Sequence, residues 1–330
     1  MKRFTNVNPR TMKDAFAAAD DGRQAGRQIA IAGGGTDLLQ LMRERIVTPD
    51  VLINLKTVQS NKAITASARG VSVGGLATLT SVVSDDTLRQ KYAVLAEAAE
   101  SVATPQIRNI GTLAGNVCQR PWCWYYRNGF KCFKNGGSVC YSAAGENEFH
   151  AIFGGGPSYI VHPSDTAVAL VALNATFVLL SATGDRTVPA QEFFALPTVN
   201  PAVENVLREG EILSEFRLPP APLGTRSHYM KVLDRETWTH AVVSAAVTLR
   251  LEAGVCRDAT IVLGGVAPVP WSVADAARLL VGKRITEELA EQAGEAAVAG
   301  ARPLTHNRYK VKLTSTTVKR AILTTAAIKA

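Results

Sequence analysis

The stretch from Asn109 to Cys140 has the sequence NIGTLAGNVCQRPWCWYYRNGFKCFKNGGSVC and combines two features. It begins as a glycine-rich turn, Gly111-Thr-Leu-Ala-Gly115-Asn116, and continues as a loop that contains four of the five cysteines of the chain. Glycines let a backbone come close to a ligand, and cysteine thiolates are soft metal ligands. The stretch therefore predicts a ligand-binding turn beside a metal site.

The cysteines of this loop are spaced Cys118-x4-Cys123-x8-Cys132-x7-Cys140. Four thiolates suit either an iron–sulfur cluster or zinc. Structural zinc sites usually contain CxxC-type pairs, and this loop has none. The aromatic residues between the cysteines would shield a cluster from water and so affect its reduction potential. We favour a cluster over zinc, and zinc over free or disulfide-bonded cysteines.

The composition is that of a soluble globular protein with more than one domain. The chain has 330 residues, 47% of them hydrophobic and 19% charged, which is long for a single core. No apolar run reaches the roughly 18–20 residues of a membrane helix, and residues 1–9 lack the apolar segment of a signal peptide. We expect no membrane span and a cytoplasmic location, with export to the periplasm beside a signal-bearing partner as the alternative.

The formal charge of +8 comes from basic residues that are scattered along the sequence. The nearest approach to a basic patch lies in the cysteine loop, at Arg120, Arg127, Lys131 and Lys134. Basic and aromatic residues together are also typical of single-strand nucleic-acid platforms, but the density of cysteines argues against one here. We expect a solvated face or an acidic protein partner, and no nucleic acid.

A second glycine turn lies upstream. Gln28 to Ala32 is a short apolar run typical of a buried strand, and it leads through Gly33-Gly34-Gly35-Thr36-Asp37 into helical spacing from Leu38 to Arg45. Glycines here would let the backbone approach a phosphate, and the free N–H groups of the helix start would point at it. A plain tight turn explains the sequence equally well. The spacing fits neither GxGxxG nor GxxxxGK[ST], so it supports neither a Rossmann fold nor a P-loop.

The remaining pattern predicts an α+β fold in three parts: an α/β lobe at 1–57, a second lobe at 58–220 and an α+β domain at 221–330. Apolar periodicity predicts the following strands: 28–32, 51–55, 63–68, 70–74, 175–181, 186–190, 212–218, 227–233, 242–251 and 256–264. It predicts the following helices: 11–19, 38–45, 79–84, 87–102, 167–173, 191–194, 274–280, 287–299 and 311–327. The turn at 111–116, taken alone, favours a bulged strand turn. Residues 219–224, rich in proline, are the clearest linker.

Two polar residues have a structural explanation beside a functional one. The helical pattern that begins at Ala167 is capped by Ser164 or Asp165. On the simpler interpretation Asp165 is such an N-cap, and on the functional one it accepts a hydrogen bond from a ligand. His150 lies in a glycine-rich loop without a period. A surface or locally hydrogen-bonded histidine is a simpler interpretation than a metal ligand.

With these motifs in order, the chain resembles the FAD-binding medium subunits of molybdenum hydroxylases, the group of xanthine dehydrogenase, carbon monoxide dehydrogenase and aldehyde oxidoreductase. The matching motifs cover nearly the whole chain and are Ala32-Gly-Gly-Gly-Thr-Asp-Leu-Leu39, Ile107-Arg-Asn-Ile-Gly-Thr-Leu-Ala-Gly-Asn116, His162-Pro-Ser-Asp-Thr-Ala167 and Leu263-Gly-Gly-Val-Ala-Pro-Val-Pro270. The resemblance implies a two-lobed FAD-binding domain of the vanillyl-alcohol-oxidase type, not a Rossmann fold, followed by an α+β domain with an antiparallel sheet and helices.

The resemblance also implies the flavin site. The first glycine turn would hold the FAD pyrophosphate, the second turn would line the other side, Asp165 would contact the FAD, and Lys231 would lie near it. The implied cofactor-binding residues are Ile31, Ala32, Gly33, Gly34, Gly35, Thr36, Asp37, Leu38, Thr104, Ile110, Gly111, Thr112, Gly115, Asn116, Asp165 and Lys231.

The cysteine loop, residues 117–141, resembles that of the subset of this family that carries an additional [4Fe-4S] cluster. The implied ligands are Cys118, Cys123, Cys132 and Cys140. Some cluster-bearing relatives are expected to have a cysteine just before the His-Pro-Ser-Asp motif, where this chain has Ser158. With Cys118 included, the chain still supplies four thiolates.

The function implied is electron transfer within a larger hydroxylase. A large subunit with a molybdenum cofactor would oxidise the substrate, and a small subunit with [2Fe-2S] clusters would pass electrons to the FAD. The FAD would then reduce an external acceptor such as NAD, a ferredoxin, a quinone or oxygen. The alternatives are a zinc-binding interaction module without redox activity and a stand-alone FAD oxidoreductase. No catalytic Ser/His/Asp set or pair of carboxylates is evident or needed.

Overall fold

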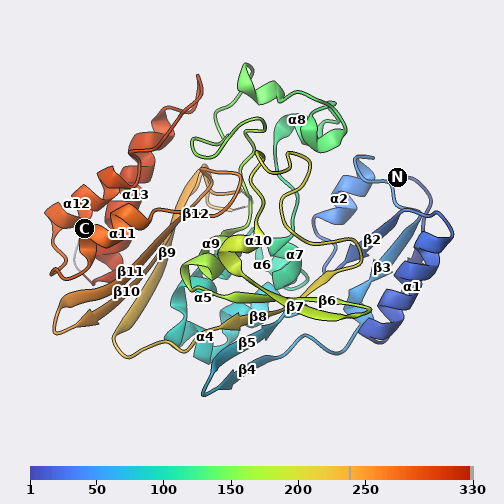
Figure 1. Ribbon diagram of the computed structural model, residues 1–330, viewed down its shortest axis with the longest axis horizontal. Helices are drawn as coiled ribbons and strands as arrows, with labels where there is room; N and C mark the ends of the chain where they lie inside the picture. The colour runs from blue at the N-terminus through green and yellow to red at the C-terminus, as the bar shows by residue number, and fades with distance from the viewer. Residues whose placement is uncertain (238, 328–330) are drawn as a thin grey trace.

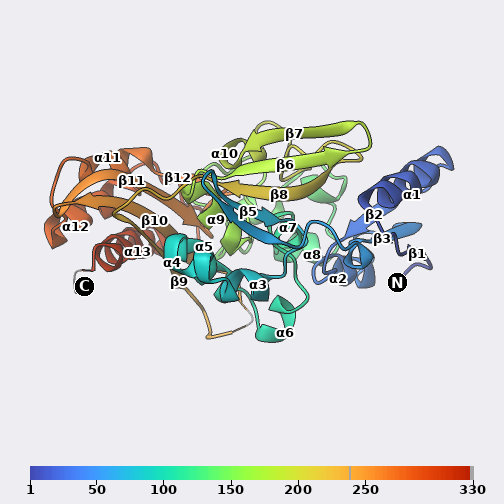
Figure 2. The same ribbon diagram turned by 90° about the horizontal axis from the view of Figure 1, so that it is seen from below.

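The computed structural model describes residues 1–237 and 239–327, and the elements given below belong to these ranges. The chain forms three sheets that lie in a row along the long axis of the molecule (Figures 1 and 2). The amino-terminal sheet lies at one end and the carboxy-terminal sheet at the other, with the largest sheet between them. None of the helices in these ranges is long and apolar enough to cross a lipid bilayer.

The amino-terminal lobe is a small parallel sheet with the strand order β1-β3-β2. Its elements are β1 (Thr5–Val7), α1 (Met12–Gln24), β2 (Ile29–Ala32), α2 (Leu38–Arg43), β3 (Val51–Asn54) and the 3-10 turn η1 (Leu55–Thr57). Thr11 and Asp14 form a capping box that starts α1. The helix extends past its predicted end at residue 19, and in this last part Arg23 pairs with Asp20 and Gly22 packs closely on Ile29.

The middle sheet is antiparallel, with the order β4-β5-β8-β6-β7. Its strands are β4 (Ile64–Ser67), β5 (Gly70–Gly74), β6 (Thr176–Ser181), β7 (Gly184–Pro189) and β8 (Ile212–Leu218). The helices of this region are α3 (Leu79–Ser84), α4 (Asp86–Lys91), α5 (Ala93–Glu100), α6 (Pro105–Arg108), α7 (Leu113–Val117), α8 (Trp124–Arg127), α9 (Asp165–Ala172) and α10 (Ala190–Phe193). A doubly wound Rossmann sheet is mostly parallel, so the prediction against that fold is confirmed by this topology.

Two predictions for this region were wrong. The helix predicted at 87–102 is broken at Tyr92, whose backbone (φ −135°, ψ 44°) is not helical. The buried Tyr92 hydroxyl donates to Pro219 O at 2.7 Å, so a contact distant in sequence overrides the local periodicity. The turn at 111–116 is not a bulged strand. It opens helix α7, which Thr112 caps by accepting a hydrogen bond from Gly115 N at 3.1 Å.

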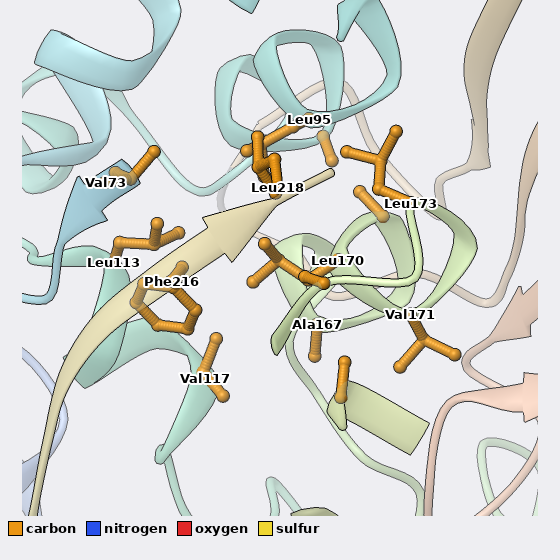
Figure 3. Packing of buried hydrophobic residues seen from close by; sticks show 14 of the residues in the cluster. Val73, Leu95, Leu113, Val117, Ala167, Leu170, Val171, Leu173, Phe216 and Leu218 are labelled. Atoms are coloured by element: carbon orange, nitrogen blue, oxygen red, sulfur yellow. The ribbon is translucent and has the colours of Figure 1, made fainter. Parts of the chain in front are cut away.

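Helix α9 lies at the centre of the molecule and is buried along its whole length. It contacts α5 and α7 on the lobe side and strands of the carboxy-terminal sheet on the other. Figure 3 shows Ala167 and Leu170 of this helix in one apolar cluster with Phe216 of β8. The apolar core therefore holds the middle lobe and the carboxy-terminal sheet together and fixes the start of α9 between them.

The carboxy-terminal sheet is antiparallel with the order β12-β11-β10-β9, as the alternating pattern predicts. Its elements are β9 (Thr225–Val232), β10 (Val243–Glu252), β11 (Val255–Gly264), β12 (Trp271–Ser272), α11 (Ala274–Leu280), α12 (Glu287–Ala296) and α13 (Tyr309–Thr325). The predicted boundaries near residues 57 and 220 fall between sheets. The division of the chain into three domains at these points remains a prediction.

Candidate functional site

The two glycine turns pack directly against each other. The first turn follows β2 and leads into α2, and the second precedes α7. A Cβ atom added to Gly33 would lie 2.5 Å from Thr112 Oγ1, and one added to Gly34 would lie 2.2 Å from Ile110 O. Only glycine leaves enough room for this approach, so the contact between the lobes requires a glycine at both positions.

A cavity of about 300 Å³ lies beside the two turns. Seven of the predicted site residues line it: Thr36, Asp37, Gly111, Thr112, Gly115, Asn116 and Asp165. Its apolar wall includes Leu79, Val102 and Ile107, while the polar turns form the other side. A second cavity of about 310 Å³ is lined by Ala32 and the three glycines of the first turn. The first cavity is thus walled largely by apolar side chains, and the second includes the backbone of the glycine turn.

The other predicted residues lie outside the first cavity. Ile31 and Leu38 pack into the apolar interior of the amino-terminal lobe. Thr104 precedes α6, next to Ala103, which does line the cavity. Ile110 is 47% exposed and meets the first turn through its backbone. Lys231 reaches the site indirectly, through Asp165.

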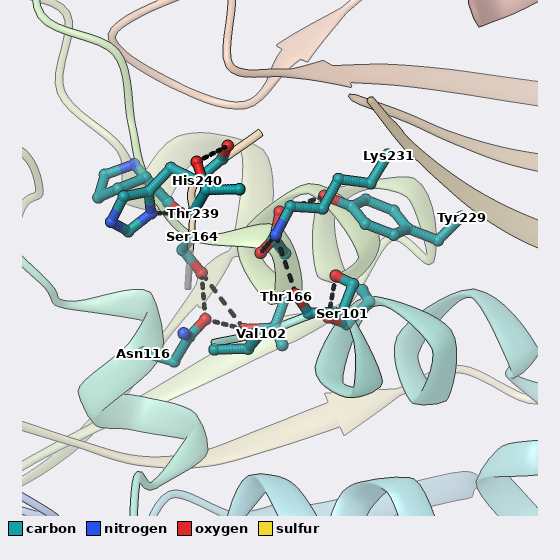
Figure 4. Close-up of polar contacts among 12 residues, drawn as sticks. Ser101, Val102, Asn116, Ser164, Thr166, Tyr229, Lys231, Thr239 and His240 are labelled. Carbon is teal, nitrogen blue, oxygen red and sulfur yellow. Dashed lines mark hydrogen bonds and ion pairs between the residues drawn. The ribbon is translucent and has the colours of Figure 1, made fainter. Parts of the chain in front are cut away.

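Asp165 is buried at the start of α9 and is the centre of a polar network. Figure 4 shows Tyr229 and Lys231 of this network. Its Oδ2 pairs with Lys231 Nζ at 2.7 Å, and its Oδ1 accepts from the Tyr229 hydroxyl at 2.6 Å. Lys231 also donates to Ser101 O at 3.0 Å, which ties β9 to the end of α5. Burial raises the pKa of Tyr229 well above its usual value, and the Asp165 carboxylate raises it further, so this tyrosine stays a donor.

The N-cap of α9 is Ser164 rather than Asp165. Ser164 Oγ accepts from Ala167 N at 3.0 Å and donates to Asn116 Oδ1 at 2.6 Å. Asn116 Oδ1 also accepts from Thr166 Oγ1 at 2.7 Å. Of the two residues predicted to cap this helix, Ser164 is therefore the cap and Asp165 is not. The network holds Asn116, at the end of the second turn, beside the start of α9.

The sequence alone did not single out several residues of the site. His240 and Trp122 line the first cavity, and their rings lie 5.0 Å apart. They come from the carboxy-terminal part and from the cysteine loop, so no local pattern connects them. Tyr229 could have been found, because it stands two residues before Lys231 on β9 and a strand places such residues on one face.

The cysteine loop consists of α8 and the short 3-10 turns η2 (Phe133–Asn135) and η3 (Tyr141–Ala143), and it lies above the two lobes in Figure 1. All four of its cysteines have free thiols. Burial raises the pKa of the Cys123 thiol to about 11, and the neighbouring thiols of Cys140 and Cys132 contribute to the rise. The charges of Cys140 and Cys132 thus act on Cys123.

Cys118 lies apart from the other three. It ends helix α7 and packs against the central apolar core, whereas Cys123 and Cys132 pack with Leu41 and Tyr126. Burial alone raises the pKa of the Cys118 thiol to about 12, with no contribution from another thiol. Among the described residues, no three or more His, Cys, Asp or Glu side chains already form a cage for a single metal ion.

Buried ion pairs attach the loop to the body of the protein. Arg127 pairs with Asp37 of the first glycine turn at 2.7 Å, and its guanidinium lies 4.3 Å from the centre of the Trp122 ring. Glu204 pairs with Lys134 at 2.8 Å and with Arg120 at 2.9 Å. Burial lowers the pKa of Lys134, while Glu204 opposes that shift.

The expectation of a solvated basic face on this loop was wrong for three of its four residues. The side chains of Arg127 and Lys134 are 7% and 1% exposed, and that of Arg120 is 29% exposed. Their charges face Asp37 and Glu204 inside the protein, because buried cations need a counterion. Asp37 and Glu204 lie far from the loop in the sequence, so sequence patterns alone did not identify them as the partners of its basic residues.

The family described as "FAD binding domain in molybdopterin dehydrogenase" matches residues 2–221. The chain belongs to this family. A second family, "CO dehydrogenase flavoprotein C-terminal domain", matches residues 228–325 of the flavin subunit. The predicted fold class is thereby confirmed, as is the function of an FAD-binding, electron-transferring subunit of the molybdenum hydroxylase oxidoreductases.

The flavin subunit is similar along its whole length to known proteins. It is 33% identical to the aldehyde oxidoreductase FAD-binding subunit of Escherichia coli (strain K12), with 96% of each chain covered. It is 27% identical to the carbon monoxide dehydrogenase medium chain of Hydrogenophaga pseudoflava, with 97% of this chain and 96% of that one covered. A solved structure of carbon monoxide dehydrogenase from H. pseudoflava that lacks the Mo-pyranopterin moiety has a TM-score of 0.77 at 26% identity, with 99% of both chains covered.

The contact between the turns leads to a first prediction. Gly34→Ala places a methyl group where Ile110 O lies, so the turns must separate at a cost of roughly 1–3 kcal/mol. We expect the purified variant to show a lower ratio of flavin absorbance to protein. Gly300→Ala is the matched control, since a Cβ atom there would meet nothing within 4 Å. Full flavin content in Gly34→Ala would show that the flavin does not need this contact.

The buried ion pair leads to a second prediction. Asp165→Asn leaves the Lys231 ammonium, 4% exposed, without its counterion, and loss of one partner of a buried pair costs about 3–5 kcal/mol. The midpoint of denaturant unfolding should fall accordingly. The double variant Asp165→Asn, Lys231→Met should recover much of the loss. Glu215→Gln, which breaks the exposed pair with Arg217, should change stability by less than about 1 kcal/mol.

Proposed function

We propose that this flavin subunit works in a complex with two partners. A large subunit with a molybdenum cofactor oxidises the substrate, and a small subunit with [2Fe-2S] clusters delivers single electrons to the FAD. The names of the relatives support this assembly, since they are subunits or medium chains of aldehyde oxidoreductase and carbon monoxide dehydrogenase. The external acceptor is NAD, a ferredoxin, a quinone or oxygen. We place the complex in the cytoplasm, with export beside a signal-bearing partner as the alternative.

Bound FAD supplies the ability to take up electrons one at a time and release them as a pair. The protein supplies the binding site. The backbone of the first turn and the start of α2 would hold the pyrophosphate, because N–H groups there have no helical partner. The second turn, with Asn116, would line the other side. Asp165 would contact the FAD where it lines the cavity, held in place by Tyr229 and Lys231.

We further propose that the loop at residues 117–141 holds a [4Fe-4S] cluster. The observation that carries this proposal is the 2.7 Å ion pair of Arg127 with Asp37, which fixes the cysteine loop against a turn of the flavin cavity. The donor set suits a cluster, because Cys123, Cys132 and Cys140 are thiols that interact within one loop. The aromatic side chains of Tyr125, Phe130 and Tyr141 pack around one another in the same loop and would limit the access of water.

Purification from the native source tests the assembly. We expect three co-purifying chains, flavin absorbance and about four irons in this subunit. A colourless protein with one zinc per chain would instead identify a zinc-binding interaction module without redox activity. An active preparation of this chain alone would identify a stand-alone FAD oxidoreductase.

A single variant separates the cluster from the flavin. Cys132→Ser should lose cluster iron and keep its FAD, because Cys132 lies in the loop and lines neither of the cavities beside the glycine turns. Iron and flavin are measured per chain by metal analysis and absorbance. Cys256→Ser is the control, since Cys256 is a buried thiol of β11 in the carboxy-terminal core. Unchanged iron in Cys132→Ser would refute its assignment as a ligand.

A further inference from the structure

Trp122 is a large aromatic side chain of the cysteine loop that lines the first cavity. The residue is 37% exposed, although its ring is apolar. The same cavity is lined by the apolar side chains of Val102 and Ile107, and its volume of about 300 Å³ is at the lower end for ligand pockets. Aromatic rings favour stacked or edge-to-face contact with other rings, so a partly open indole beside an apolar cavity suits a flat, conjugated ligand.

The indole ring of Trp122 is held in place from within the loop. The Arg127 guanidinium lies over it, 4.3 Å from the ring centre, in a cation–π contact. Arg127 is itself fixed, because it pairs with Asp37 at 2.7 Å and its Nε donates to Pro121 O at 2.9 Å. Asp37 also lines the first cavity. Protein contacts alone therefore place the ring, and a group that is already in place loses less entropy when a ligand binds.

A second ring, from the carboxy-terminal part of the chain, meets Trp122 at the cavity. The centre of the His240 imidazole lies 5.0 Å from that of the indole, and the two planes are tilted by 39°. Its Nδ1 donates to Pro163 O at 3.3 Å, so the imidazole is attached next to the start of α9 (Figure 4). Pro163 and His240 line the same cavity. The cysteine loop and the carboxy-terminal part thus each contribute one ring to the cavity wall.

We propose that Trp122 contacts the isoalloxazine ring of FAD, so that the cysteine loop forms part of the flavin site. The inference rests on the flavin site proposed above and is independent of what the cysteines bind. Trp122 is a positioning residue: it orients the flat ring in the cavity by aromatic contact and keeps water from that side. The ion pair of Arg127 with Asp37 then fixes the indole ring as well as the loop.

The test is the fluorescence decay of the flavin bound in the complete complex. A photoexcited flavin takes an electron from an indole ring in contact with it, which shortens its fluorescence to picoseconds, whereas a phenylalanine ring does not donate. Trp122→Phe should therefore lose the picosecond decay. Trp124→Phe is the matched control, because Trp124 belongs to the same loop, is 62% exposed and lines neither cavity. All proteins, including the reference, carry Trp238→Phe, since Trp238 stands next to the cavity-lining Thr239 in the sequence.

The affinity for FAD gives a second, independent measurement. Trp122→Ala removes the ring, and we expect the dissociation constant of FAD to rise about tenfold, as the loss of one aromatic pair predicts. Trp122→Phe should weaken binding less, because it keeps a flat ring, and Trp124→Ala should not weaken it. Val102→Ala changes the apolar wall of the same cavity and should shift the absorption bands of the bound flavin.

The contact is overturned if Trp122→Phe keeps the picosecond decay, or if Trp124→Phe loses it instead. An unchanged dissociation constant of FAD in Trp122→Ala overturns the positioning role. Shifted absorption bands in Val102→Ala, together with an unchanged decay in Trp122→Phe, would reject Trp122 and leave the flavin ring in the first cavity. Unchanged flavin spectra in all variants would instead overturn the placement of the ring in this cavity, and with it the flavin site proposed above.

Discussion

The site depends on the close contact between the two glycine turns. Gly33 and Gly34 come so near Thr112 and Ile110 that no side chain fits between them. This contact sets the distance between the amino-terminal lobe and the middle lobe, and the first cavity opens beside it. The start of α2 and the start of α7 are thereby brought to one place, although their sequences lie far apart.

Buried charges determine how the remaining parts meet. Asp37 forms an ion pair with Arg127 of the cysteine loop, and Glu204 forms one with Lys134 of the same loop. Asp165 forms an ion pair with Lys231 of β9. Such pairs add little net stability, because the cost of removing charges from water offsets their attraction. They are strongly selective for position, since a misplaced loop would leave both charges buried and unpaired. The loop and the carboxy-terminal sheet are thus held in one arrangement relative to the first cavity.

The sequence was most informative where a local rule decides the outcome. Alternation predicted β9, β10 and β11, and glycine spacing located both turns. The sequence was least informative where a contact between residues far apart in the chain determines the local structure. Tyr92 breaks a periodic helix because its hydroxyl bonds to Pro219, and the basic residues of the cysteine loop are buried because their acidic partners lie in other segments. The spacing of the cysteines likewise did not show that Cys118 is placed apart from the other three.

The His150 carbonyl accepts hydrogen bonds from Asn307 Nδ2 at 3.1 Å and from Lys310 Nζ at 3.3 Å, and these have a consequence for the maturation of the protein. Asn307 lies 157 residues after His150, so during synthesis the segment that follows the cysteine loop leaves the ribosome long before the side chains that hold it exist. Until residues 307–310 have been made and have folded, this segment lacks its hydrogen bonds from Asn307 and Lys310. The segment that follows the cysteine loop is therefore fixed only in a late step of folding, when α13 and the residues before it have packed onto the body of the protein.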